Sequence, residues 1–114
     1  MYKVIFHLNE EERVKLACRN IDNLLNDMES SDEDIKVELL IHAGAVNSCK
    51  DDNNENLDSI KNVIKRGVTV AICNNTLNGL NISKDELLED VFVVSSGVGE
   101  LTRKQNEGWA YIKP

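Results

Sequence analysis

Short apolar runs alternate along the chain with longer amphipathic stretches, and this alternation predicts strands that alternate with helices. Continuous apolar runs are typical of strands buried on both faces of a parallel sheet. In one of them Ile35, Val37, Leu39 and Ile41 face one way, while Lys36, Glu38, Leu40 and His42 face the other. The predicted strands are 3–8, 35–44, 68–73, 91–96 and 109–112.

Helices are expected between these strands because apolar residues recur there at a helical spacing. One buried face is formed by Val14, Ala17, Cys18, Ile21, Leu24, Leu25 and Met28, and a second by Leu57, Ile60, Val63 and Ile64. A short helix over 84–89 and a last helix over 97–108 complete the set. Asn9 with Glu12 and Ser83 with Glu86 match the capping-box pattern, and Gly67 and Gly108 are placed to end helices. Repeated strand–helix units predict an α/β fold with a parallel sheet.

Length and charge restrict the class of protein. A chain of 114 residues is expected to form one domain over 1–114. The net charge of −7 argues against nucleic acid or an anionic membrane surface as a partner, since both require basic patches. No segment has the length of a membrane span, and the N-terminus lacks the basic and apolar regions of a signal peptide.

Three cysteines occur at positions 18, 49 and 73, with no CxxC pair. Their number and spacing favour neither a zinc site nor a disulfide framework, so we expect a reducing, cytoplasmic location. Cys18 falls on a buried helical face. Cys49 falls in the polar stretch 46–54, which predicts a loop with an exposed thiol that either resolves a disulfide with Cys73 or has no function.

Polar and chemically active residues follow the predicted strands. Because the carboxyl ends of parallel strands share one edge, where ligands of α/β sheets bind, we expect these residues to lie together. His7 ends the first strand, His42 and Gly44 follow the second, Cys73 ends the third, and Ser96 and Gly97 follow the fourth. Asn74, Asn75 and Thr76 come directly after Cys73 and are good helix-capping residues whatever Cys73 does.

Several interpretations of this edge are open. Each histidine either takes part in chemistry or is a half-buried side chain satisfied by backbone carbonyls. A His/His/Cys zinc site lacks a close pair of ligands in the sequence. A phosphate-binding loop and a GxSxG hydrolase are excluded because neither motif is present.

The stretches "VELLIHAGAV", "GVTVAICNNTL" and "ISKDELLEDVFVVSSGVGELTRKQNEGWAYIKP", with the opening "KVIFHLNEEER", resemble the DsrE-like family, in particular its small YchN-type members. The resemblance covers nearly the whole chain. It implies a three-layer α/β/α fold with a five-stranded parallel sheet in the order 4-3-2-1-5, and assembly into trimers or hexamers. Better-understood relatives are sulfur carriers, which implies that Cys73 holds a persulfide and passes its sulfur between donor and acceptor proteins.

In that hypothesis Cys73 lies at a pocket on the sheet edge and His42 accepts its proton. Asn74 and Asn75 donate hydrogen bonds to the anion, and no cofactor or metal is used. The further ligand-binding residues are expected to be Thr76, His7, Gly44, Ser96 and Gly97. The alternatives are an oligomeric module that binds a small anion or a protein, with Cys73 incidental, and a metal-dependent hydrolase that uses both histidines.

The implied strand order favours self-association. Right-handed crossovers through strands 1, 2, 3 and 4 place three helices on one face of the sheet. A single helix then remains for the opposite face, so apolar surface stays exposed unless another subunit covers it.

Overall fold

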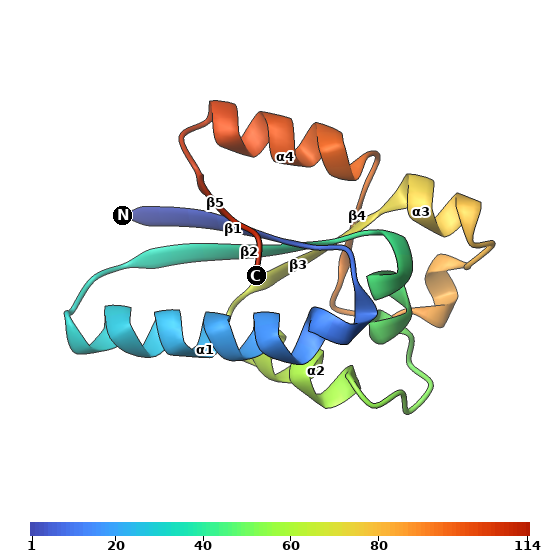
Figure 1. Ribbon diagram of the computed structural model, residues 1–114, viewed down its shortest axis with the longest axis horizontal. Helices are drawn as coiled ribbons and strands as arrows, with labels where there is room; N and C mark the ends of the chain where they lie inside the picture. The colour runs from blue at the N-terminus through green and yellow to red at the C-terminus, as the bar shows by residue number, and fades with distance from the viewer.

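One parallel sheet of five strands organises the protein. A computed structural model describes residues 1–114 (Figure 1), and its strands are hydrogen-bonded in the order β4-β3-β2-β1-β5, all parallel. This is the order that the family resemblance implied. The strands are β1 (Tyr2–Leu8), β2 (Ile35–Ile41), β3 (Thr69–Cys73), β4 (Phe92–Val94) and β5 (Ala110–Ile112).

Helices cover the two faces of the sheet unequally. Figure 1 shows α1 and α2 on one face and α4 on the other, while the short helix α3 lies at the carboxyl end of β3. The segment after α3 packs Ile82, Leu87 and Val91 into the core on the α1/α2 side. None of the helices has the length and apolar character needed to cross a bilayer. The helices are η1 (Glu11–Arg13), α1 (Val14–Ser30), η2 (Ala43–Cys49), α2 (Leu57–Lys65), α3 (Asn74–Gly79), η3 (Lys84–Glu86) and α4 (Gly97–Asn106).

The core is divided by the sheet into a large and a small part. The cluster on the α1/α2 side contains 22 buried residues, whereas the cluster under α4 contains four, namely Ile5, Leu40, Ala71 and Leu101. The alternation predicted for β2 is confirmed, because Val37, Leu39 and Ile41 enter the large cluster and Leu40 the small one. Phe92 pairs in register with Ala71 and so shares the α4 face, where it is 61% exposed.

A contact between Glu38 and Lys104 joins α4 to the sheet. Glu38 of β2 is only 3% exposed, and its Oε1 lies 3.7 Å from Nζ of Lys104 on α4. The same ammonium lies 4.6 Å from the ring centre of Trp109, a cation–π contact. The second carboxyl oxygen of Glu38 is buried without a hydrogen-bond partner.

The stretch predicted as a polar loop is largely ordered and buried. Residues 43–49 form the 3-10 helix η2, which buries Ala45, Val46, Ser48 and Cys49. The buried hydroxyl of Ser48 accepts a hydrogen bond from the amide of Asn56 at 3.1 Å, which satisfies the polar group. The prediction of an exposed Cys49 was therefore wrong, while the prediction of a buried Cys18 is confirmed.

The helix-end predictions were right at three of four places. The Ser83–Glu86 capping box is present, although the helix it starts is only the 3-10 turn 84–86. Gly67 and Gly108 follow α2 and α4 with φ of +94° and +92°, a conformation that glycine adopts without steric cost. The Asn9–Glu12 box is absent, because Asn9 Oδ1 instead accepts a hydrogen bond from Lys113 at 3.1 Å.

Candidate functional site

Cys73 lies where one strand ends and two helices begin. It is the last residue of β3 and the N-cap of α3. The backbone N–H of Gly97, the first residue of α4, donates a hydrogen bond to its Sγ at 3.3 Å. Both helices thus direct free N–H groups and the positive ends of their dipoles at the sulfur. Side-chain atoms of Cys73 are nearly covered, since the residue is 5% exposed.

These surroundings favour the thiolate of Cys73. Burial alone raises the pKa of the thiol, but hydrogen bonds from the backbone and hydroxyl of Thr76 and from the backbone N–H groups of Gly97 and Asn75 together lower it below the ordinary value. By contrast, burial raises the pKa of both Cys18 and Cys49 to about 12, with smaller contributions from Asp22 and from Cys18 respectively. Only one of the three thiols is therefore suited to react as an anion at neutral pH.

A hydrogen bond to Thr76 joins the loop after β2 to this site. The backbone N–H of Ala43 donates to Thr76 Oγ1 at 3.0 Å, which leaves the hydroxyl proton free for the sulfur. Ala43 holds a left-handed φ of +52°, which is unusual for a residue with a Cβ. A strained residue next to His42 shows that the surrounding contacts fix this loop firmly.

Both histidines lie at the same edge and touch each other. Nε2 of His7 and Nε2 of His42 are 2.5 Å apart, and Nδ1 of His7 is 2.7 Å from the hydroxyl oxygen of Tyr111. Burial lowers the pKa of both imidazoles, and the positive charge of Lys113 lowers them further; His42 has the same effect on His7. The two rings are therefore neutral at neutral pH and available as proton acceptors.

Gly97 separates the thiol from His42. A Cβ built on Gly97 would lie 3.6 Å from Sγ of Cys73 and 3.7 Å from Cβ of His42. The two residues thus approach the same point from β3 and β2. A residue without a side chain at this position leaves a methyl-sized space between them.

The remaining predicted residues are less closely engaged. Asn75 contributes its backbone N–H to the sulfur, whereas Asn74 is exposed and is not among the donors to it. The hydroxyl of Ser96 caps α4 by accepting from the N–H of Gly99 at 3.1 Å. The carbonyl of Gly44 accepts from the side chain of Asn47 at 3.2 Å. Tyr111 was missed, because only its register beside β1 brings it to His7.

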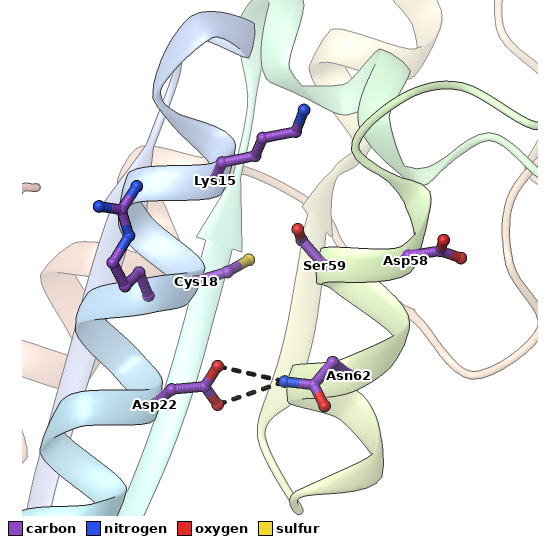
Figure 2. Close-up of a pocket in the computed structure, with 7 residues that line it drawn as sticks. Lys15, Cys18, Asp22, Asp58, Ser59 and Asn62 are labelled. Carbon is purple, nitrogen blue, oxygen red and sulfur yellow. Dashed lines mark hydrogen bonds between the residues drawn. The ribbon is translucent and has the colours of Figure 1, made fainter.

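No cavity opens at this edge, contrary to the predicted pocket. The five cavities of the molecule lie elsewhere, and none is lined by Cys73, His7 or His42. One of about 420 Å³ lies between α1 and α2, where Asn62 donates to Asp22 at 3.2 and 3.3 Å beside the buried Cys18 (Figure 2). No group of three His, Cys, Asp or Glu side chains lies close enough together to hold a metal ion.

Comparison with known proteins decides the family. The model of the DsrE/DsrF-like family matches residues 3–114. The chain belongs to the DsrE/DsrF-like family. Among solved structures, the protein of unknown function MTH1491 from Methanobacterium thermoautotrophicum is similar to this DsrE-like chain, with 39% identity and a TM-score of 0.91. The YchN protein of E. coli shares the fold, with 19% identity and a TM-score of 0.76. Both comparisons cover 100% of either chain. No curated protein matches the chain.

Proposed function

We propose that this DsrE-like protein carries sulfur as a persulfide on Cys73. The observation that carries the proposal is the placement of Sγ at the start of α3 and α4, where backbone N–H groups lower the pKa of this thiol alone. Membership of the DsrE/DsrF-like family is compatible with a sulfur relay. The alternative of an incidental cysteine leaves this arrangement of donors around one sulfur without a purpose.

The transfer needs no cofactor and no change of overall oxidation state. The Cys73 thiolate attacks the outer sulfur of a donor persulfide R–S–SH, forming a new S–S bond while the R–S⁻ group leaves with the electron pair of the broken bond. Cys73 then holds S–SH. An acceptor thiolate attacks that outer sulfur in the same way, takes it as a persulfide and returns Cys73 to the thiolate.

The donor groups at the site suit this reaction. A thiolate and a persulfide anion both carry negative charge next to Sγ, and the N–H groups of Gly97, Asn75 and Thr76 stabilise such charge without rearranging. His42 and His7 are neutral bases at the same sheet edge, and Cβ of His42 flanks Gly97 together with Sγ of Cys73.

We further propose that the protein works as a homotrimer or hexamer in the cytoplasm and exchanges sulfur with donor and acceptor proteins. The four-residue core under α4, with Phe92 exposed on the same face, supports burial of that face against a second copy. Three free cysteines suit a reducing compartment.

Intact-mass spectrometry after incubation with polysulfide tests the sulfur-carrier function. We expect an adduct of about 32 Da that maps to the peptide containing Cys73 and is removed by a reducing agent. Cys73→Ser should lose the adduct, and Cys18→Ala, which removes a buried thiol, should keep it. An adduct on another cysteine, or none in the wild-type protein, would overturn the proposal.

A further inference from the structure

We propose that His7, His42 and Tyr111 form a single proton-accepting unit that serves Cys73. The inference rests on the proposed function only for the identity of the proton donor, the Cys73 thiol. Cβ of His42 and Sγ of Cys73 both flank Gly97, His7 contacts His42, and Tyr111 contacts His7, so the unit extends across three strands.

The order of the strands places these residues in a row. Cys73 ends β3, His42 follows β2, His7 is in β1 and Tyr111 is in β5. The sheet order puts β3, β2, β1 and β5 side by side. A path from the thiol to the outer edge of the sheet therefore passes through each of the four residues in turn.

The contacts along this row fix the number of protons. Two Nε2 atoms 2.5 Å apart require one proton between them, since two lone pairs would repel and two N–H groups would clash. Two neutral imidazoles hold two protons in total. The second proton therefore occupies Nδ1 of either His7 or His42, and the other Nδ1 is the one free acceptor position of the pair.

Tyr111 accommodates both arrangements. Its hydroxyl, 2.7 Å from Nδ1 of His7, donates when that nitrogen is bare and accepts when it carries a proton. When the phenol oxygen accepts, the free position moves to Nδ1 of His42, whose Cβ flanks Gly97 together with Cys73. Tyr111 thus acts as a positioning residue, because it sets which end of the pair takes up a proton.

Proton uptake by the unit balances the proposed sulfur transfer. The proton of the Cys73 thiol reaches His42 through water at the sheet edge, since Sγ of Cys73 and Cβ of His42 flank Gly97 without a direct hydrogen bond, and the pair becomes a shared imidazolium with three protons. After the thiolate has attacked the donor, the leaving R–S⁻ takes this proton and departs as R–SH. The pair is then neutral again, and no other reactant is consumed.

The surroundings of the two rings oppose the uptake of a second added proton, which would be the fourth on the pair. Burial and the charge of Lys113, whose ammonium is held by Asn9, act against positive charge on both rings. The titratable groups that face the pair are Tyr111 and Lys113, both from the C-terminal segment. We therefore expect uptake of one proton by two rings.

Nuclear magnetic resonance measures this directly, because the chain has only two histidines. Two-bond ¹H–¹⁵N spectra recorded across the titration should show both rings responding together with one midpoint. Tyr111→Phe should change the tautomer ratio of His42, which it does not touch, and Tyr2→Phe should not. Two independent midpoints, or a His42 tautomer ratio insensitive to Tyr111→Phe, would overturn the inference.

The rate at which Cys73 takes up sulfur tests whether the unit accepts the proton of this thiol. Loss of one hydrogen bond predicts that Tyr111→Phe loads sulfur from polysulfide about fivefold more slowly than the wild type, with an altered pH profile, while Tyr2→Phe loads normally. Equal loading by both variants would overturn the link to Cys73. If no variant and no wild-type protein loads sulfur while the rings titrate as one unit, the proposed function fails and the shared-proton unit stands.

Discussion

The backbone N–H of Gly97 donates to Sγ of Cys73 at 3.3 Å, so the first residue of α4 reaches across the sheet edge to the last residue of β3. This bond joins a helix on the thinly covered face to the only thiol whose pKa is lowered. Anything that displaces the start of α4 is therefore expected to change the chemistry of Cys73.

Cys73 is expected to be the fastest of the three cysteines to alkylate at about pH 6.5. All three thiols are nearly covered, but the pKa of Cys73 is lowered, whereas burial raises the pKa of Cys18 and Cys49 to about 12. Peptide mapping after a timed exposure to iodoacetamide measures each site, and denatured protein provides the control in which all three react. Faster labelling of Cys49 than of Cys73 in the folded protein would contradict this prediction.

Gly97→Ala is expected to slow sulfur loading of Cys73 without lowering the free energy of unfolding. The added methyl group meets Cys73 and His42 at 3.5 to 3.7 Å, ordinary contact distances, so the fold should tolerate it. Replacing a helical glycine should even raise the free energy of unfolding by about 0.5 kcal/mol. Sulfur loading of Cys73 should nevertheless slow, because the space between thiol and His42 is filled.

Gly79→Ala is the matched control, since a Cβ there meets nothing within 4 Å. Urea unfolding and intact-mass loading kinetics, run on both variants, distinguish the two effects. Unchanged loading by Gly97→Ala would show that this space has no part in the reaction.

Glu38 is expected to make the protein less stable as the pH rises. Burial raises the pKa of this carboxyl to about 8, helped by the neighbouring carboxyl group of Glu100 and opposed by Lys104. The folded state then binds more protons than the unfolded state between the ordinary value of about 4.5 and about 8, so the free energy of unfolding falls across that window.

Glu38→Gln should remove this component. Thermal melts at about pH 5 and about pH 8.5 should show the variant gaining stability relative to the wild type at the higher pH. Glu89→Gln, a change at an exposed carboxylate, should run parallel to the wild type. A stability difference between Glu38→Gln and the wild type that is the same at both pH values would contradict the assigned protonation.

Phe92→Asp is expected to dissociate the oligomer. Phe92 is 61% exposed on the α4 face, and a charge placed in a buried interface costs several kcal/mol unless it is paired. Multi-angle light scattering should give a trimer or hexamer for the wild type and a smaller species for the variant. Leu80→Asp, a change at an exposed apolar residue after α3, is the control. A monomeric wild type at micromolar concentration would refute the assembly.

The elements were largely predictable because strand and helix periodicities differ clearly along this chain. The two faces of β2 followed from simple alternation, and the resemblance supplied the strand order. The burial of Cys49 could not be read so easily. Ala45, Val46 and Cys49 are buried together in a short 3-10 helix, but polar residues such as Asn47 and Lys50 lie between and after them in the sequence. So short a helix has too few residues for its apolar positions to recur at a recognisable spacing.

The site was predictable as a location but not as a set of contacts. The ends of parallel strands had to meet, which brought Cys73, His42 and His7 to one edge. Direct contact between the histidines, and their bond to Tyr111, depends on the register of β5 beside β1, where Tyr111 pairs with Ile5. The missing pocket depends on side-chain volumes at the edge, which strand order alone does not specify.

The raised pKa values of Cys18 and Cys49 leave Cys73 as the one cysteine of the chain suited to react as an anion. A protein with a second accessible thiol nearby could expel a bound sulfur by closing an internal disulfide. This chain has no such exit, so a persulfide formed on Cys73 waits for another molecule to remove it. In the proposed function, the lifetime of the persulfide is therefore set by how often an acceptor protein meets Cys73.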